Sequence, residues 1–222
     1  MPRPGEVSLA HGGVLFLDEL PEFHRNVLES LRQPLEDGLV RVARAKRSVT
    51  FPARFMLVAA MNPCPCGFLT DPSHRCCCPS TKVAGYLAKI SGPLLDRIDL
   101  HIDVPPVPFD TLSQTQVAES SAHIKTRIVR ARTQQRKRLK PLGLSCNAHL
   151  RHRDLRATCP MTGAATTLLK SAMHELAFSA RSYDKILKIS RTIADLADSD
   201  TILPDHIAEA VQYRSLDRQL WR

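Results

Sequence analysis

The sequence His11-Gly12-Gly13-Val14-Leu15-Phe16-Leu17-Asp18-Glu19 decides the fold of the first half of the chain. Four consecutive apolar residues run directly into two acids, which is typical of a buried parallel strand that ends at an edge of a sheet. Such a strand places the carboxylates of Asp18 and Glu19 where the chain leaves the sheet. Taken alone, the pattern also fits an ordinary strand of an α/β protein whose last residues happen to be acidic.

A second apolar segment, at 55–61, runs into the amide side chain of Asn62. The acid pair followed by the amide is the order typical of a nucleoside triphosphatase. There, Asp18 would hold Mg²⁺, Glu19 would polarise the attacking water as in a Walker B motif, and Asn62 would hold that water near the γ-phosphate as sensor 1. The alternative role of Asn62 is an Asx turn before Pro63.

The phosphate-binding loop that accompanies such a strand, G-x-x-x-x-G-K-[ST], is absent from the 222 residues. None of the glycines is followed by lysine, and only a short segment precedes Val14. We therefore expect the C-terminal part of an ATPase without its nucleotide-gripping half, as in a gene fragment or a truncated open reading frame. The isolated chain is predicted to be inactive for this reason.

Apolar periodicity predicts the elements around these motifs. A helix is predicted over 21–37, where Pro34 would kink or end it early and Gly38 would cap it. Alternation predicts a β-hairpin with arms at 39–43 and 48–51. The remaining predictions are a helix at 81–90, a helical turn at 94–99, a strand at 100–104, and helices at 113–139, 161–178, 182–196 and 204–213. Pro105-Pro106-Val107-Pro108 marks the best domain boundary, and the sequence after it is mainly helical.

The composition favours a cytoplasmic protein with a polyanionic partner. With 222 residues, 43% of them hydrophobic, the chain can bury a core. The sequence has no apolar run of membrane-spanning length, and its first residues are not a secretory signal, so we expect no membrane partner. The formal charge of +9 suits a polyanion, although it is also compatible with solubility alone. The aromatic content of 5% argues against base-stacking platforms.

Two basic features are candidates for contact with nucleic acid. The hairpin tip contains Arg44, Lys46 and Arg47. The long helix predicted at 113–139 and the residue just past it contain a series of cations with no acid among them: Lys125, Arg127, Arg130, Arg132, Arg136, Lys137, Arg138 and Lys140. These cations spread around the helix rather than forming one stripe. Charge of this kind gives salt-dependent binding to phosphates without reading the sequence of bases.

The cysteines are concentrated in the loop after Asn62. Cys64-Pro65-Cys66 and Cys76-Cys77-Cys78 supply two C-x-C pairs, so Cys64, Cys66, Cys76 and Cys78 could give four thiolates to a structural Zn²⁺. Cys77 and His74 are the substitutes for one of these ligands. C-x-C is a less usual spacing than C-x₂-C, and a loop with incidental reduced thiols is the alternative.

Several of these strings together resemble a known family. The segments at 14–19, 52–55, 62–67, 91–99 and 191–196 resemble the magnesium-chelatase-like AAA+ ATPases, specifically the ComM/YifB (competence-related) subfamily, and the resemblance covers nearly the whole chain. It implies an α/β fold: the C-terminal part of an AAA+ P-loop core over 1–106, with parallel strands and a β-hairpin insertion, then an all-α lid over 107–222. The chain departs from the family in lacking its N-terminal Lon-protease-like domain and its Walker A half.

The resemblance also implies roles for two arginines. Arg97 resembles the arginine finger that projects into the nucleotide site of a neighbouring subunit, and its alternative role is an ion pair with Asp96 or Asp99. Arg181 resembles sensor 2, a lid arginine that contacts the nucleotide within its own subunit. Arg191 is the rival for that role, but it lies in the middle of its predicted helix.

The resemblance further implies the cofactors and partners of the intact protein. These are ATP and Mg²⁺, a homo-oligomeric assembly (a hexamer) and DNA, with the hairpin tip lining a central pore. The implied activity is ATP hydrolysis that drives DNA processing in recombination or transformation, through branch migration by a helicase-like motor. The alternatives are a metal-chelatase-type motor subunit and a non-catalytic, zinc-bearing fragment that binds nucleic acid.

Overall fold

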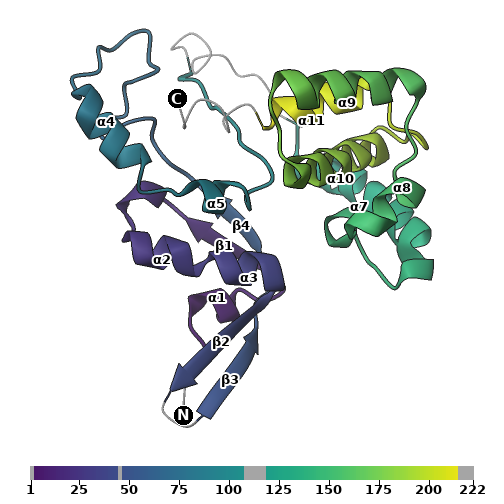
Figure 1. Cartoon of the computed structure of the whole chain (residues 1–222), viewed down its shortest axis with the longest axis horizontal. Helices are drawn as coiled ribbons and strands as arrows, with labels where there is room; N and C mark the ends of the chain where they lie inside the picture. Colours follow the sequence, from purple (N-terminus) through teal and green to yellow (C-terminus); the bar gives the residue numbers. More distant parts are fainter. Residues whose placement is uncertain (1–2, 45–46, 108–118, 215–222) are drawn as a thin grey trace. The chain divides into compact units, whose positions relative to one another are not determined.

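The computed structural model describes residues 3–44, 47–107 and 119–214, and these divide into two compact units. Unit 1 contains the residues up to Ile98 together with Asp103–Pro106, and unit 2 contains Asp99–Ile102 and the described residues from Val107 onward. In Figure 1 the elements up to α5 belong to unit 1 and those from α7 onward to unit 2. Unit 1 is mixed α/β with parallel strands and unit 2 is helical, so the predicted fold class is confirmed. The domain boundary itself stays a prediction.

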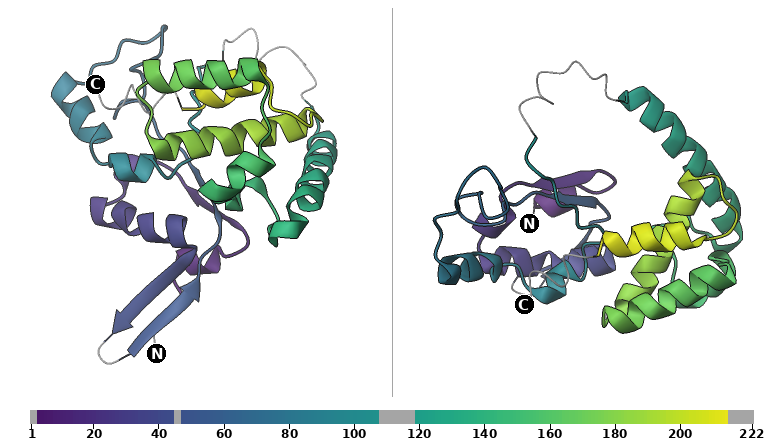
Figure 2. Two further views of the ribbon diagram at one scale, coloured as in Figure 1. Left: turned by 45° about the vertical axis from the view of Figure 1, so that its right-hand side comes forward. Right: turned by 90° about the horizontal axis from the view of Figure 1, so that it is seen from above.

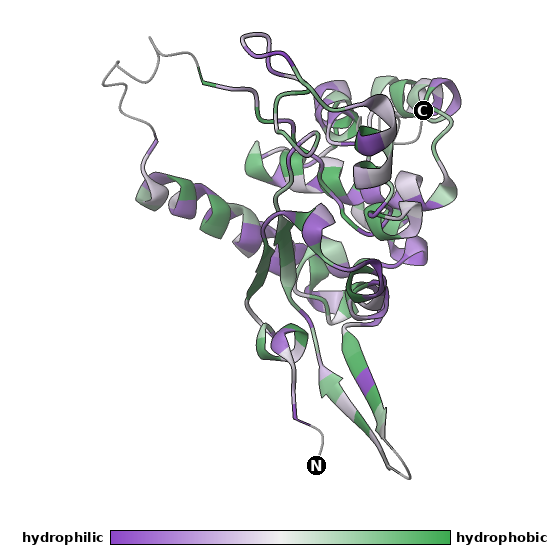
Figure 3. Ribbon diagram, turned by 90° about the vertical axis from the view of Figure 1, so that its left-hand side faces the viewer, coloured by the Kyte–Doolittle hydropathy of each residue, from purple (hydrophilic) through white to green (hydrophobic). Residues whose placement is uncertain are grey.

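The predicted strand pair forms the sheet of unit 1. β1 (Val14–Leu17) and β4 (Met56–Ala59) pair in parallel, residue for residue from the first to the last. β4 is shorter than the predicted 55–61, and Figure 3 shows both strands as strongly hydrophobic. Leu15 and Leu17 pack against the core of unit 1. The buried members of that core are Leu20, Leu28, Leu31, Ile90, Leu94 and Leu95.

The single helix predicted over 21–37 is wrong. The chain instead forms a 3₁₀ turn, η1 (Leu20–Glu22), and two short helices, α2 (Arg25–Ser30) and α3 (Arg32–Asp37). Pro34 explains the break, because its ring would clash with the carbonyl of the residue four positions earlier if α2 continued. In the first turn of α3 the missing N–H of Pro34 costs nothing. Gly38, at φ 66°, ends α3 as predicted.

The predicted β-hairpin follows α3 directly. β2 (Leu39–Arg44) and β3 (Arg47–Pro52) pair in antiparallel register, which confirms the hairpin and lengthens each arm by a residue or two. Figures 1 and 2 show its arms extending away from the rest of unit 1. Ala45 and Lys46, in the predicted tip, lie outside the described residues.

The end of unit 1 corrects two predictions. α1 (Glu6–Leu9) and α4 (Ser80–Leu87) are regular, but α5 covers Gly92–Leu95 rather than 94–99. The helix begins earlier because the Ser91 hydroxyl accepts the Leu94 N–H as an N-cap. The strand predicted at 100–104 is wrong. Within the described ranges no strand pairs with this segment, and without a partner its backbone groups cannot form a ladder.

Unit 2 is built from helices connected by short turns. Its elements are α7 (Ser121–Leu139), η2 (Lys140–Leu142), η3 (Asn147–His149), α8 (His152–Thr158), α9 (Gly163–Glu175), α10 (Ala180–Leu196) and α11 (Pro204–Gln212). The helix predicted from 113 begins at Ser121, because the Ser120 hydroxyl accepts the His123 N–H, and 113–118 lies outside the described residues. α8 was not predicted, because Leu155 is its single large apolar residue.

The core of unit 2 contains both apolar and charged side chains. Its buried apolar residues come mainly from α9, α10 and α11, while α7 contributes Leu139 at its end and α8 contributes Leu155. The Asp195 carboxylate is buried and accepts hydrogen bonds from Arg138 at 2.7 Å and from Arg191 at 3.1 Å. Asn147 adds a third donor at 2.8 Å. In the part of the chain that the structure describes, no helix has the length and apolar character needed to cross a membrane.

Candidate active site and metal centre

The acid pair and the amide leave the sheet at the same edge. Beyond the last pair of β1 and β4, the Ala60 N–H donates to the Leu17 carbonyl at 2.9 Å and the Leu20 N–H donates to the Ala60 carbonyl at 3.0 Å. The two chains therefore stay together as they pass the end of the sheet. Asp18 and Glu19 follow one strand and Asn62 follows the other, all three exposed at the carboxyl edge.

Glu19 has an unusual backbone conformation that the sequence did not reveal. Its φ of 51° and ψ of 47° are left-handed, which is uncommon for a residue other than glycine. The turn is held by the Glu19 N–H, which donates to Asp18 Oδ1 at 2.9 Å, and by the Glu22 N–H, which donates to the Glu19 carbonyl at 2.7 Å. Such strain concentrates at functional sites, where the surroundings hold it in place. The direction in which Glu19 leaves the strand is thus fixed.

Tyr86 of α4 lies behind this edge and was missed by sequence reasoning. The tyrosine is 7% exposed, and its hydroxyl lies near the backbone of Asn62. Burial, together with the nearby carboxylates of Glu22 and Glu19, raises the pKa of Tyr86 above its ordinary value. The buried phenol therefore stays neutral beside the chain at Asn62. No pattern in the sequence connects α4 to this position.

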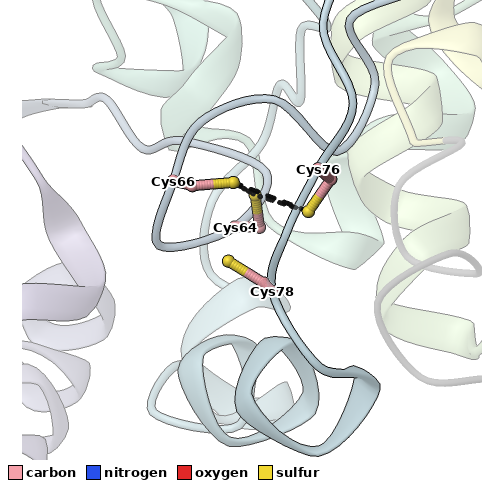
Figure 4. A group of neighbouring side chains, drawn as sticks. All are labelled: Cys64, Cys66, Cys76 and Cys78. Atoms are coloured by element: carbon pink, nitrogen blue, oxygen red, sulfur yellow. Dashed lines mark hydrogen bonds between the residues drawn. The ribbon is translucent and has the colours of Figure 1, made fainter.

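The four predicted cysteines come together (Figure 4). The Sγ atom of Cys66 lies 3.4 Å from that of Cys64 and 3.5 Å from that of Cys76, and the sulfurs of the cluster, with Cys78, all lie within 4.8 Å of one another. Four thiolates around zinc at about 2.3 Å would be about 3.8 Å apart, so the observed spacing fits a tetrahedral site. The donor set and its geometry therefore suit Zn²⁺.

The two substitutes are not part of this cluster. Cys77 is exposed, and the grouped thiols do not include it. His74 stacks on Phe68, with ring centroids 4.9 Å apart, and its Nδ1 lies 3.1 Å from a carboxylate oxygen of Asp71. The cluster thus contains Cys76 and Cys78, which flank Cys77 in the sequence, and leaves out Cys77 itself.

The thiols differ in acidity because they share one small volume. The backbone of Phe68, followed by the thiol of Cys64, lowers the pKa of Cys66 to about 6. The backbone of Cys78 acts to lower the pKa of Cys76, but burial and the neighbouring thiols outweigh it and raise that pKa to about 12. Hydrogen bonding to Cys66 likewise raises the pKa of Cys78. A cluster that concentrates negative charge on one sulfur is suited to a cation.

Arg97, which follows α5, is held within its own unit. Its Nη1 donates to the Pro93 carbonyl at 2.7 Å, its Nε donates to the Arg32 carbonyl at 3.1 Å, and its Nη2 forms an ion pair with Glu36 of α3. The side chain is 15% exposed. Sequence reasoning did not consider Glu36, because 61 residues separate it from Arg97. Asp99 pairs instead with Lys185, at 2.8 Å.

The lid arginines occupy different surroundings within unit 2. Arg181 is the second residue of α10 and is exposed. Arg191 is 1% exposed, and its guanidinium bonds to Asp195 and to the carbonyl oxygens of Ser199 and Asp200. Arg191 therefore stabilises the core of unit 2. At the hairpin tip, the backbones of Arg44 and Arg47 pair, and Lys46 lies outside the described residues.

Comparison with known proteins matches both units to one family. The family described as "Magnesium chelatase, subunit ChlI" matches residues 1–112, and "Magnesium chelatase, subunit ChlI C-terminal" matches residues 118–214. The chain is 45% identical to "Uncharacterized protein YifB" of Escherichia coli and 44% identical to "Competence protein ComM" of Haemophilus influenzae, each over 221 residues. Those residues are 99% of this chain and 42% of each relative.

A more distant similarity extends beyond this group. The chain is 23% identical to "DNA replication licensing factor Mcm6" of Drosophila melanogaster over 238 residues, which cover 98% of this chain and 26% of that protein. The two family matches together cover the sheet, the cysteine cluster and the helical unit. The chain therefore belongs to the magnesium chelatase ChlI family, in the branch that resembles ComM and YifB, and has the AAA+ type of α/β fold with a helical C-terminal region.

Proposed function

We propose that this chain is part of an ATP-hydrolysing AAA+ motor subunit that acts on DNA. The observation that carries the proposal is the emergence of Asp18, Glu19 and Asn62 at one edge of the parallel pair β1 and β4. Ligands of open α/β sheets bind outside the carboxyl ends of their strands. Two carboxylates and an amide at that edge are suited to a hydrated Mg²⁺ and an attacking water.

Each of these residues would have a separate task. The Asp18 carboxylate would hold Mg²⁺, which in such enzymes neutralises charge on the phosphates. Glu19 would orient and polarise the attacking water, and its left-handed backbone supports this role because it fixes where the carboxylate starts. Asn62, whose backbone lies near the buried Tyr86 hydroxyl, would position the same water through its amide.

The two arginines would complete the site from other parts of the assembly. Arg97 would act in trans on the nucleotide of a neighbouring subunit in a homo-oligomeric ring (a hexamer), where a guanidinium offsets charge that develops during phosphoryl transfer. Its contacts with Pro93, Arg32 and Glu36 would orient it for this purpose. Arg181, exposed at the start of α10, would contact the nucleotide within its own subunit as sensor 2.

The Cys64–Cys78 cluster would hold a structural Zn²⁺ in the loop that begins just after Asn62. Three observations support this role: the tetrahedral spacing of the sulfurs, the full burial of Cys64 and the low pKa of Cys66. When bound, the metal would supply a rigid cross-link and no chemistry of its own. The four thiolates would fix the loop on the side where Tyr86 contacts Asn62.

The DNA part of the proposal is supported by charge and by the relatives. The hairpin tip contains Arg44, Lys46 and Arg47, and one relative is described as a competence protein while another is described as a DNA replication licensing factor. Movement of DNA in recombination or transformation, through branch migration, is the activity that we propose. A metal-chelatase-type motor subunit is the second candidate, favoured by the description of the matching family.

A chimera tests the ATPase part. Residues 1–222 would replace the aligned 221 residues of the Haemophilus influenzae ComM protein, which supplies the rest of its own length. We expect DNA-stimulated ATP hydrolysis, abolished by Glu19→Gln with nucleotide affinity retained. Glu22→Gln is the matched control, because this carboxylate is exposed three residues away. Hydrolysis unaffected by Glu19→Gln would contradict the proposal, and hydrolysis without any response to DNA would favour the chelatase-type motor.

Mixing two inactive variants tests the trans role of Arg97. Arg97→Ala should remove most ATPase activity, because trans arginines supply on the order of a thousandfold in rate or more. In a mixed ring of Arg97→Ala and Glu19→Gln subunits, some interfaces combine an intact Arg97 with an intact Glu19 and should regain activity. If co-assembled subunits regain none, Arg97 serves only as the structural partner of Glu36.

A further inference from the structure

Helix α7 has an unusual excess of positive charge. Over Ser121–Leu139 the helix carries seven lysines and arginines and no acid. These cations are Lys125, Arg127, Arg130, Arg132, Arg136, Lys137 and Arg138, and Lys140 follows directly. On a helical wheel they point in nearly every direction, so the sequence alone gives no defined surface.

The structure shows that three of these cations are neutralised by acids of unit 2. Arg127 pairs with Glu119 at 3.2 Å, Arg138 pairs with Asp195 at 2.7 Å, and Arg130 pairs with Asp198. These pairs are local contacts within the helical unit. The paired carboxylates offset the positive charge of these three arginines locally. The three arginines therefore contribute little to the electrostatic field outside the protein.

Four of the five remaining cations form one row along the helix, and the fifth, Lys137, lies about 120° around the helix from Lys125. Lys125, Arg132, Arg136 and Lys140 stand at positions i, i+7, i+11 and i+15, and we call them the basic row. Residues 7 and 11 positions apart differ by only about 20° around an α-helix, and 15 positions give about 60°. Lys140 continues the helical path, with φ −51° and ψ −43°.

The basic row is accessible and keeps its charge. Lys125, Arg136 and Lys140 are exposed, and Arg132 is half-buried with its Nη1 3.3 Å from the neutral amide oxygen of Gln135. Within the described residues, none of the four forms an ion pair with a carboxylate. The row rises about 22 Å along a rigid helix, since each residue adds about 1.5 Å.

We propose that the basic row binds the phosphate backbone of double-stranded DNA. A stiff line of cations complements a stiff, regular line of phosphates, whose charge averages about one per 1.7 Å of duplex. Cations in a row of this kind bind phosphates of any base sequence. It is a second DNA contact, separate from the hairpin tip, and it needs neither ATP nor the candidate active site.

The composition of this surface disfavours other partners. The core of a protein–protein interface is enriched in aromatic residues and depleted of charge, whereas the exposed apolar residues between Lys125 and Arg132 are Ile128 and Val129, and neither is aromatic. Attachment to an anionic membrane would need a broad apolar face beside the cations. Charge complementarity therefore favours a nucleic acid backbone.

The salt dependence of DNA binding tests the proposal directly. The 222-residue chain would be titrated against a fluorescently labelled DNA duplex at several salt concentrations, with anisotropy as the signal. Each phosphate contact contributes about 0.9 to the slope of log K against log salt. The triple variant Lys125→Gln/Arg136→Gln/Lys140→Gln should therefore flatten the slope by about 2.7.

Matched variants distinguish an effect of the basic row from an effect of the net charge of the chain. Lys82→Gln/Arg156→Gln/Lys170→Gln removes three exposed cations from α4, α8 and α9 and should leave the slope nearly unchanged. Val129→Lys adds a cation within the row and should steepen the slope by about 0.9, a gain that misfolding cannot produce. Neutralising Arg44, Lys46 and Arg47 tests the hairpin tip independently.

Several outcomes would overturn the proposal. Equal losses in the two triple variants would show that only net charge matters. An unchanged slope in Val129→Lys would show that DNA does not follow the row. Equally tight, row-dependent binding of polyglutamate would identify an acidic polypeptide as the occupant. Because the assay contains no nucleotide, failure of the ATPase proposal would leave these results unaffected.

Discussion

At the scale of single residues, Asp195 joins three polar side chains in the interior of unit 2. One fully buried carboxylate accepts hydrogen bonds from Arg138, Arg191 and Asn147. Burial alone would raise the pKa of Asp195, but hydrogen bonds from Arg138 and then Asn147 outweigh it and lower the pKa. Removing the carboxylate would leave two guanidinium groups close together without their acid.

We expect Asp195→Asn to destabilise the chain by about 3 to 5 kcal/mol near neutral pH, the usual cost of breaking a buried ion pair. Because the folded pKa of Asp195 is lowered, its contribution is present above the unfolded pKa, about 3.9, and is lost as pH falls toward the folded value. Denaturant unfolding at several pH values should show the two proteins converging below about pH 4. Asp205→Asn, at an exposed position, is the control. A constant difference across pH would contradict the assignment.

We also expect the purified chain to retain close to one zinc ion. Cys64→Ser/Cys66→Ser should lose it, because two ligands cannot close a tetrahedral shell. Cys77→Ser is the matched control, since this exposed cysteine lies in the same loop but outside the cluster, and it should retain the metal. Elemental analysis of protein prepared without added metal decides the question. Zinc retained by the double variant would show that the ligand set is wrong.

The sequence predicted residues that act through local order, and it missed those that depend on distant contacts. The C-x-C pairs indicated the cysteine cluster, because both pairs lie in one loop. By contrast, the pairing of Glu36 with Arg97 and the contact of Tyr86 with Asn62 depend on how α3, α4 and α5 pack. No spacing rule connects such positions. The left-handed backbone of Glu19 was equally hidden, since glutamate rarely adopts it.

At the scale of elements, periodicity located the strands, the hairpin and most helices, because their apolar residues recur with a clear period. It failed where tertiary context decides. The segment at 100–104 has the composition of a strand but no described partner, and α8 has too few apolar residues to be recognised. Pro34 indicated a break in the predicted helix. The break lies at Leu31, about one turn before the proline, because the proline ring clashes with a carbonyl of the preceding turn.

Two glycines should respond to alanine in opposite directions. Gly38→Ala should destabilise unit 1 by about 1 kcal/mol or more, because φ is 66° and the new Cβ would lie 2.8 Å from Arg54 Cγ. Gly85→Ala should stabilise it by about 0.5 to 1 kcal/mol, because this glycine lies within α4 with nothing within 4 Å of the new Cβ. Denaturant unfolding measures both changes. Similar effects at the two positions would show that backbone conformation at Gly38 is not the cause.

At the scale of the whole molecule, the sheet of unit 1 has one uncovered face. Val14 and Phe16 of β1 are 57% and 59% exposed, and their cross-strand partners Met56 and Val58 are 62% and 42% exposed. Parallel sheets are normally covered on both faces. The chain spans 42% of the length of the ComM and YifB relatives, so those proteins have further sequence that could supply a cover and a phosphate-binding loop.

These features set the nucleotide affinity expected of the 222 residues themselves. In the proposed site, Asp18, Glu19 and Asn62 would act on a γ-phosphate. The phosphates themselves are normally bound by backbone N–H groups and a lysine of G-x-x-x-x-G-K-[ST], a motif that this sequence does not contain. We therefore expect weak or no binding of Mg·ATP and no hydrolysis by this chain. Isothermal titration measures the affinity, and the ComM chimera serves as the positive control. Sub-micromolar affinity in the 222-residue chain would mean that other residues grip the phosphates. In that case the exposed Arg181 would be the first to substitute, with the buried Arg191 left in place to preserve the fold.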